Sequence, residues 1–205
     1  NSAKMTLEEV LEVMEQAERE QKMTVRLHTG DPCLYGAIRE QMDHLDELGI
    51  AYDSCPGVSS FCGAAAALNL EYTLPGVSQS LIITRMEGKT AVPPGESIES
   101  FAAHQASMAI YLSSGMIEEL SKRLLTGGYE KDTPAAIVYK ATWPDEKAFV
   151  CTVGTLGGTA RENGITRLAV VLVGDVVKHQ HYQKSKLYDA DWETEYRSAK
   201  SGQNR

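Results

Sequence analysis

Cysteine is scarce in this chain of 205 residues, which has four, at positions 33, 55, 62 and 151. Four are too few for the disulfide framework of a small secreted domain, and no two have the Cys-x-x-Cys spacing that suits zinc. The sequence therefore predicts buried free thiols in a protein of the reducing cytoplasm.

Basic charge is also in short supply. The chain has 20 Lys and Arg against 28 Asp and Glu, which gives a formal net charge of -8 and an isoelectric point near 5.2. In no stretch do Lys and Arg gather with aromatic residues, so the chain offers no positive field for a phosphate backbone. We expect no nucleic-acid partner.

Long apolar runs are missing. No stretch approaches the roughly 20 residues that a helix needs to cross a bilayer. The residues at the start, Asn1-Ser2-Ala3-Lys4, are not followed by the apolar core of a signal peptide. We expect no membrane partner and a cytoplasmic location.

Clusters of metal ligands and catalytic triads are not evident either. The five histidines are scattered singly, and no Ser-His-Asp or Cys-His arrangement can be recognised. His179 and His181 come nearest to a ligand pair. We expect no metal and leave the catalytic residues unassigned.

Apolar periodicity predicts an α/β protein. Thr6-Leu7-Glu8-Glu9 has the spacing of a capping box, and a helical repeat of apolar residues follows it. Gly49 stands where the left-handed end of a second helix belongs. In this first part we expect helices over 7–17, 38–48 and 61–68, with strands over 23–28 and 51–55.

The rest of the chain is richer in strands. The pattern predicts strands over 80–85, 107–112, 135–140, 147–151 and 168–173, with helices over 97–104 and 117–125. Because strands outnumber helices here, a mixed sheet is expected. We predict an N-terminal α/β domain over 1–76, a C-terminal α/β domain over 77–177, and an aromatic tail over 178–205 that wraps a surface or forms an interface.

Two loops follow the strands predicted in the first domain. Thr29-Gly30-Asp31-Pro32 follows one strand, and Pro56-Gly57-Val58-Ser59-Ser60 follows the other. Ligands of open α/β sheets bind beyond the carboxyl ends of strands, where glycine permits a close backbone approach and Asp or Ser provides hydrogen bonds. The loops suit a nucleoside-sized cofactor, although Gly-Asp-Pro is also an ordinary turn.

Those two loops lie in segments that resemble a known family. Residues 25–32 with Tyr35-Gly36-Ala37-Ile38, and residues 56–61 with the alanine run and Gln79 to Arg85, are similar to two conserved segments of the tetrapyrrole (corrin/porphyrin) methyltransferases. The resemblance implies a fold of two α/β domains, each with a mixed or mainly parallel sheet flanked by helices, and a cofactor in the cleft between them. The family's usual opening strand and glycine-rich loop are not recognised, so the first domain is expected to lack them.

Within the family, three further segments resemble the C11-methyltransferases of precorrin-4 or cobalt-precorrin-4. They are residues 110–114, the run Lys140-Ala141-Thr142-Trp143-Pro144-Asp145-Glu146, and residues 185–189. The resemblance implies an S-adenosylmethionine-dependent C-methyltransferase of cobalamin biosynthesis, with a tetrapyrrole substrate and a homodimeric state. Two alternatives remain: a sibling that methylates another ring position, and a chain that binds the donor without turnover.

The resemblance also implies site residues. The methyl donor, S-adenosylmethionine, and its product, S-adenosylhomocysteine, would be bound by Thr29, Gly30, Asp31, Leu34, Ser59, Ser60, Leu112, Ala141 and Ala169. Arg85, Lys140 and Tyr35 would meet the substrate, whose carboxylates need basic partners. Tyr35, Tyr111 and Tyr139 are candidate bases, although tyrosines at such places more often pack in a core.

Overall fold

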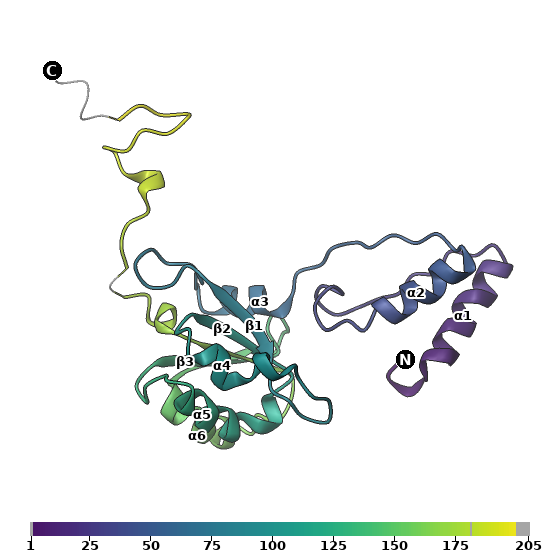
Figure 1. Ribbon diagram of the computed structural model, residues 1–205, viewed down its shortest axis with the longest axis horizontal. Coiled ribbons are helices and arrows are strands. Elements are labelled where there is room, and N and C mark those ends of the chain that lie inside the picture. Colours follow the sequence, from purple (N-terminus) through teal and green to yellow (C-terminus); the bar gives the residue numbers. More distant parts are fainter. Residues whose placement is uncertain (1, 181, 200–205) are drawn as a thin grey trace. The chain divides into compact units, whose positions relative to one another are not determined.

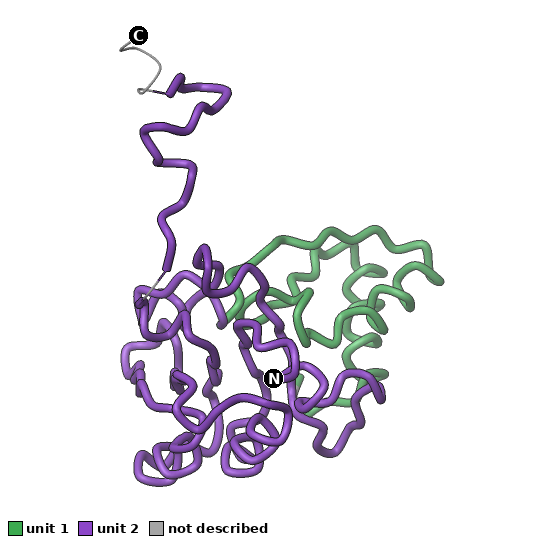
Figure 2. Tube along the Cα trace, turned by 60° about the vertical axis from the view of Figure 1, so that its left-hand side comes forward, with its two compact units in different colours: residues 1–60 green, residues 61–205 purple. Residues whose placement is uncertain are grey.

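The chain folds into two compact units, residues 1–60 and 61–205 (Figures 1 and 2). The structure is a computed structural model and describes residues 2–180 and 182–199. His181 and the last residues of the predicted tail, 200–205, lie outside the described residues. The domain limits predicted at Gly76 and near residue 178 stay a prediction, and each unit is described here by itself.

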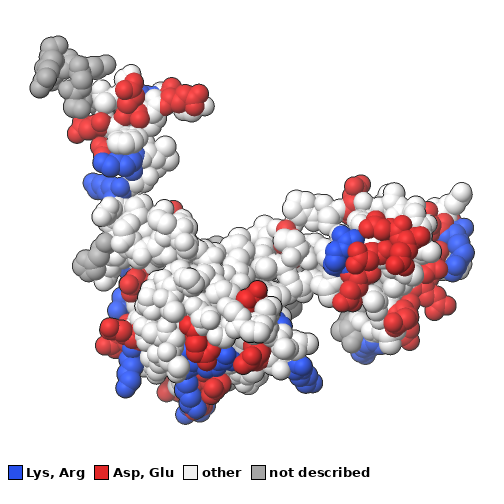
Figure 3. Space-filling view, viewed as in Figure 1, with Lys and Arg blue, Asp and Glu red and all other residues white. Residues whose placement is uncertain are grey.

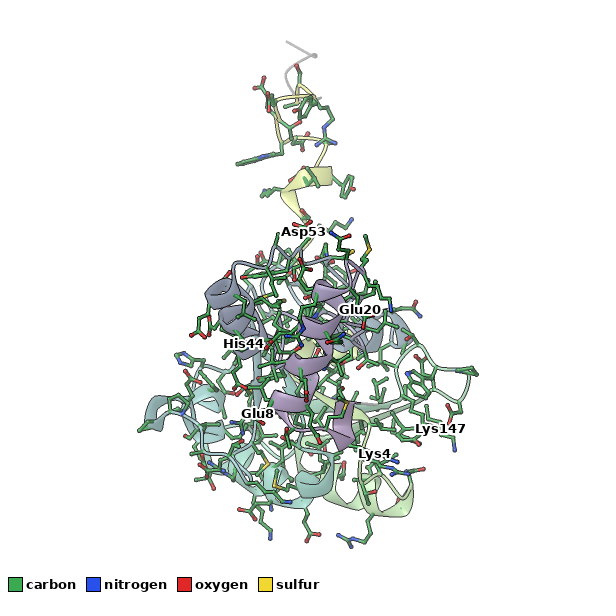
Figure 4. The ribbon with its side chains drawn as sticks, turned by 90° about the vertical axis from the view of Figure 1, so that its right-hand side faces the viewer. Lys4, Glu8, Glu20, His44, Asp53 and Lys147 are labelled. Atoms are coloured by element: carbon green, nitrogen blue, oxygen red, sulfur yellow. The ribbon has the colours of Figure 1, made fainter. Side chains whose placement is uncertain are left out.

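Unit 1 contains the helices α1 (Leu7–Arg19) and α2 (Arg39–Leu48). Both form where the sequence predicts helices, although α1 ends two residues later and α2 begins one residue later than expected. The capping box of α1 is complete: Thr6 accepts from the Glu9 amide, and Glu9 accepts from the Thr6 amide. Gly49 ends α2 with a φ of 66°. His44 of α2, which is labelled in Figure 4, bonds Glu15 of α1 at 2.8 Å, a contact between the two helices.

The two strands predicted in the first part do not form. Residues 22–28 and 51–59 have no regular secondary structure, and no strand occurs in the described part of unit 1. Met23 and Leu27 are 91% and 82% exposed. Alternation makes a segment competent for a strand, but a strand also needs a neighbour whose N–H and C=O groups complete the ladder, and within the described residues of unit 1 none does so.

Unit 2 contains a mixed sheet of five strands in the order β1-β2-β5-β3-β4, which confirms the strands predicted from residue 80 onward. β1 pairs in parallel with β2, and the other three pairings are antiparallel. The three central strands are buried along nearly their whole length, as expected of a sheet covered on both faces. The strands are β1 (Leu81–Arg85), β2 (Ser107–Tyr111), β3 (Pro134–Tyr139), β4 (Lys147–Thr152) and β5 (Ala169–Val173).

Helices α4 (Ile98–Ala102), α5 (Ile117–Thr126) and α6 (Leu156–Glu162) lie together below the sheet in Figure 1. Their apolar sides share one core cluster with alternate strand residues such as Ile110 and Ile137. Helix α6 was not predicted, because its sequence, Leu-Gly-Gly-Thr-Ala-Arg-Glu, combines a short length with two glycines. Helix α3 (Ser60–Ala67) forms where the small-residue run predicts a helix.

The described part of the tail has little regular structure beyond the short 3-10 helix Lys186–Tyr188. Arg197 closes a small loop there, because its guanidinium donates to the carbonyl oxygens of Leu187, Asp189 and Trp192. Tyr182, Tyr188 and Tyr196 are exposed. The tail thus presents aromatic side chains to its surroundings.

Surface charge follows the acidic composition. On the face shown in Figure 3, acidic side chains gather over the helices of unit 1, while the basic ones of unit 2 are interspersed with acidic ones. None of the helices in the described residues has the length and apolarity needed to cross a membrane.

Candidate functional site

In unit 1 the two predicted loops lie against each other, and Asp31 holds them together. One carboxylate oxygen of Asp31 accepts the Cys33 amide at 2.8 Å, and the other accepts the Gly57 amide at 2.9 Å. The first bond forms a local turn, and the second joins loops that are 26 residues apart. An ordinary Gly-Asp-Pro turn therefore explains the bond from the Cys33 amide but not the bond from the Gly57 amide.

Glycine is required at this contact. A Cβ on Gly57 would lie 2.3 Å from the carbonyl oxygen of Gly30, which no side chain tolerates. Gly30 itself has a φ of 72°, in the left-handed region that favours glycine. A Cβ on Gly36 would meet the carbonyl oxygen of Pro32 at 2.0 Å, so the turn that contains Leu34 and Tyr35 is equally tight.

The hydrogen bonds also set the charge of this loop pair. Donation from Cys33 and then from Gly57 lowers the pKa of Asp31, so its carboxylate stays ionised at neutral pH. A side-chain hydrogen bond to Asp31 raises the pKa of the Cys33 thiol. Thr29 is exposed, whereas Ser59 and Ser60 are partly buried at the start of α3.

In unit 2 the sheet register brings the other three predicted donor residues to the same end of the sheet, where their strands begin or end. β5 runs antiparallel to both β2 and β3, and Ala169 pairs with Tyr139 at the start of β5. Leu112 directly follows β2, and Ala141 lies two residues after the end of β3. Both therefore lie near the point where β5 begins with Ala169. Sequence spacing could not show this, because it depends on the direction of β5.

The backbone at this edge is unusual. Leu112, Lys140, Thr142 and Leu168 have positive φ values of 52°, 48°, 70° and 56°. Such conformations cost non-glycine residues free energy and concentrate at functional sites. The Lys140 amide donates to the carbonyl oxygen of Leu168 at 2.8 Å, which ties two of these strained residues together. The strand edge is therefore held in a fixed, strained form.

Ala169 contributes shape more than hydrogen bonds. It is buried, its amide donates to the Ser114 hydroxyl at 3.2 Å, and that hydroxyl donates to the Ala169 carbonyl oxygen at 3.0 Å. Leu112, by contrast, is 68% exposed and offers an apolar side chain at the end of β2. Sequence analysis did not identify Ser114, whose partner lies 55 residues away.

Helix α3 packs closely on the loop after β3. A Cβ on Gly63 would lie 2.9 Å from the Thr142 side chain and 3.3 Å from Cβ of Ala141. A glycine at this position thus lets the helix approach a predicted donor residue. The role of Gly63 is visible only in the folded chain, since its sequence context is simply a run of small residues.

The two basic side chains predicted for the substrate both have internal partners. Arg85 donates to the carbonyl oxygens of Met86, Thr90 and Ala91 and so organises the loop after β1. Three of its five N–H groups are used in this way, and two remain for another acceptor.

Lys140 is more fully engaged. Its ammonium pairs with Asp145 at 2.5 Å and lies 5.3 Å and 5.2 Å from the ring centroids of Tyr139 and Trp143. The hydrogen bond that Lys140 donates to Asp145 raises the pKa of Lys140. Tyr35, the third residue predicted for the substrate, lies in unit 1 with a φ of 56° and is exposed.

An open apolar groove of about 510 Å³ lies elsewhere in unit 2, between α3 and the start of β1. Phe61, Ala65, Tyr72 and Leu81 are among the residues that line it. None of the residues predicted for donor or substrate lines this groove. Among the described residues, no three His, Cys, Asp or Glu side chains gather as metal ligands do; His181 lies outside that set.

Comparison with known proteins gives this arrangement a context. The family model for Tetrapyrrole (Corrin/Porphyrin) Methylases matches residues 1–157. The chain belongs to this family. The sequence resemblance and the α/β fold class with a mixed sheet are thereby confirmed.

Several tetrapyrrole methylases are similar over nearly the whole chain. The cobalt-precorrin-4 C(11)-methyltransferase of Methanocaldococcus jannaschii is 47% identical over 97% of this chain and 77% of its own length. The enzyme of the same name from Priestia megaterium is 44% identical over 92% of this chain and 74% of its own. The precorrin-4 C(11)-methyltransferase of Pseudomonas aeruginosa is 40% identical over 96% and 78%.

Solved structures of tetrapyrrole methyltransferases have a similar fold. A cobalt precorrin-4 methyltransferase described as a cobalamin biosynthetic enzyme superposes with a TM-score of 0.84 at 44% identity, over 86% of this chain and 74% of that one. A uroporphyrin-III C-methyltransferase from Thermus thermophilus, complexed with S-adenosyl homocysteine, superposes with a TM-score of 0.70 over 84% of this chain and 75% of that one. At 22% identity, the second likeness shows the fold alone.

Proposed function

We propose that this chain transfers a methyl group from S-adenosylmethionine to C11 of precorrin-4 or its cobalt complex, in cobalamin biosynthesis. Identities of 40–47% to enzymes named for that reaction, over 92–97% of the chain, carry the proposal. The run from Lys140 to Glu146, which suggested this branch of the family, forms a closed turn: Asp145 pairs with Lys140, and Glu146 accepts the Thr142 amide.

The residues present fit a nucleoside-sized donor. In unit 1 the backbones of Gly30 and Gly57 approach each other with no side chain between them, so that no Cβ of either residue blocks a close approach by a ligand. In unit 2 the exposed leucine at position 112 offers an apolar surface suited to a purine ring. The proposed donor residues are Thr29, Gly30, Asp31, Leu34, Ser59, Ser60, Leu112, Ala141 and Ala169.

When bound, S-adenosylmethionine supplies an electrophilic methyl group on a positively charged sulfur. The chain's own residues act by orientation and by exclusion of water, which together lower the barrier for an in-line attack by carbon. The tight loop pair in unit 1 and the strained strand ends in unit 2 suit this task, because both are fixed before any ligand arrives.

For the substrate, the geometry favours Arg85 over Lys140. Arg85 keeps two N–H groups for a carboxylate of the macrocycle, whereas the Lys140 ammonium is held between two rings and Asp145. We propose that Arg85 and Tyr35 meet the substrate and that Lys140 does so only if its pair with Asp145 opens.

The proposal includes a homodimer in the cytoplasm. Exposed aromatic side chains in the tail, among them Tyr188 and Trp192, and exposed Met23 and Leu27 provide apolar surface for association between copies. Three of the four cysteines are exposed and Cys151 is partly buried, so the prediction of buried thiols is wrong. Thiols that are free in the structure suit a reducing compartment. A monomeric mass in light scattering at micromolar concentration would contradict the dimer.

Calorimetric titration with S-adenosylhomocysteine tests the donor site. We expect binding by the unmodified chain, a loss of at least about tenfold in affinity for Asp31→Ala, because two hydrogen bonds to a charged group disappear, and little change for Asp53→Ala. Asp53 is the matched control, because it is an exposed aspartate of the same unit, so that both variants remove one negative charge. Equal losses in the two variants would count against the loop pair as the donor site.

The reaction is tested by the position of the new methyl group. Turnover of precorrin-4 with isotope-labelled donor should place the label at C11. A uroporphyrinogen-III C-methyltransferase of Bacillus subtilis is also 30% identical over 79% of the chain, so labelling at another ring position would favour a sibling activity. Donor binding without any labelled product would favour a chain that binds without turnover.

A further inference from the structure

The hydroxyl of Tyr111 makes a long-range bond that the proposed donor site does not explain. Tyr111 is the last residue of β2 and is 9% exposed. Its oxygen accepts the amide of Phe61, 50 residues away, at 2.7 Å. Phe61 is the second residue of α3, and amides in the first turn of a helix have no acceptor within the helix. The tyrosine therefore satisfies a donor that the helix itself leaves unpaired.

The other side of the same residue is held as well. The hydroxyl of Tyr72 donates to the carbonyl oxygen of Phe61 at 2.7 Å, and the two rings lie 5.9 Å apart between centroids. Burial, and then the neighbouring Tyr111, raise the pKa of Tyr72, so that its hydroxyl keeps the proton that it donates. Phe61 is thus fixed through both its N–H and its C=O groups.

The elements joined by this bond both carry proposed donor residues. Leu112 directly follows Tyr111 at the end of β2, and Ser60 is the first residue of α3. The same helix meets Ala141 through Gly63, one turn further along. One hydroxyl therefore connects the helix that begins with Ser60 to the strand that delivers Leu112.

We propose that Tyr111 is a positioning residue for the methyl donor: its hydroxyl fixes the start of α3 on the end of β2. This role rests on the proposed donor site. It gives the Tyr111 hydroxyl the task of holding a backbone amide in place, and not that of moving a proton of the substrate. It also explains why a tyrosine, and not the phenylalanine that a purely apolar core accepts equally well, stands at the end of a buried strand.

The decisive variant is Tyr111→Phe, with Tyr129→Phe as a matched control. Tyr129 is 4% exposed, and its hydroxyl donates to the carbonyl oxygen of Ala106, next to the opposite end of β2. Each change removes one buried hydroxyl that bonds the backbone of unit 2, so their effects on thermal stability should be similar. Only Tyr111 touches an element of the proposed donor site.

We expect the dissociation constant for S-adenosylhomocysteine to rise about tenfold in Tyr111→Phe and less than about twofold in Tyr129→Phe, since loss of a buried hydrogen bond has that magnitude. Hydrogen exchange of the Phe61 amide should accelerate only in the first variant. Equal dissociation constants in both variants, or an unchanged Phe61 amide, would overturn the proposal.

Two further outcomes are distinguishable. If the unmodified chain does not bind S-adenosylhomocysteine, the proposed donor site fails and the positioning role fails with it, whatever the exchange of the Phe61 amide shows. If Tyr111→Phe does not fold, Gly63→Ala tests the same helix, because the new methyl group would press on the γ-methyl of Thr142. That variant should bind the donor more weakly, and Thr142→Ser, which removes the γ-methyl, should restore binding; failure of the rescue counts against the proposal.

Discussion

Two regions of the chain carry apolar side chains in patterns that suit a strand, yet only one of them forms a sheet. In unit 2, Ile110 and Ile137 lie on adjoining strands of the sheet and are fully buried. In unit 1, Met23 and Leu27 belong to a run in which apolar and polar residues alternate, and both are exposed. The difference shows that alternation indicates which segments can pair, whereas pairing itself requires a neighbour in the correct register.

The interactions that stabilise the two units also differ. Unit 2 is stabilised by a shared apolar core beneath its sheet. The loop pair of unit 1 is ordered by Asp31, which bonds both loops, and by glycines that allow backbone atoms to meet. A change in apolar volume should therefore affect unit 2 most, and a change in backbone space should affect the loops of unit 1 most.

The largest expected effect tests the buried side of the comparison. Ile137→Ala should lower the free energy of unfolding by about 2–5 kcal/mol, because it leaves a cavity in the core. Val25→Ala, at an exposed position of unit 1, should change it by less than about 0.5 kcal/mol. Urea unfolding measures both. A comparable loss for Val25→Ala would mean that the segment over 22–28 is paired in solution.

The second effect tests the loops. Gly57→Ala should weaken binding of S-adenosylhomocysteine by at least about tenfold, because the added Cβ would force apart the two loops that meet at Gly30. Gly95→Ala is the control, since a Cβ there meets nothing within 4 Å. The thermal midpoint of the unfolding of unit 2 should not move in either variant. Unchanged affinity for Gly57→Ala would show that the loop contact is not needed for the donor.

The smallest effect compares ion pairs in the two units. Arg123 of unit 2 has a side chain only 15% exposed and bonds Glu99 through two nitrogens, which lowers the pKa of Glu99 to about 2. Because the folded pKa lies below the ordinary value of 4.5, the stabilisation is present above pH 4.5 and is lost as the pH falls toward 2. Arg39 of unit 1 pairs with Asp43 and Asp46 but is 61% exposed.

The unmodified chain should lose about 1 kcal/mol of stability more than Glu99→Gln on acidification, an amount that already allows for solvent screening. Arg39→Gln should leave the pH profile of stability nearly unchanged. The measurement is the urea midpoint between about pH 5 and about pH 2.5, a range over which Glu99 loses most of its charge. Parallel profiles for the unmodified chain and Glu99→Gln would contradict the assignment.

The sequence alone determined the local elements. The capping box at Thr6 and the glycine at the end of α2 could be predicted because each depends on residues close by in the sequence. The strands from residue 80 onward could be predicted from their apolar runs. The two loops with Gly30 and Gly57 were recognised in the same way. Family resemblance, and not periodicity, supplied the reaction.

Only the tertiary structure decided which segments meet. The direction of β5 brings Leu112 and Ala169 to one edge, Asp31 reaches Gly57, and the Tyr111 hydroxyl reaches the Phe61 amide. Among the described residues it also gave the segment over 22–28 no neighbouring strand, and it gave Lys140 the internal partner Asp145. The physical reason is the same in each case: hydrogen bonding and close packing act over a few ångströms in space, whatever the separation along the chain.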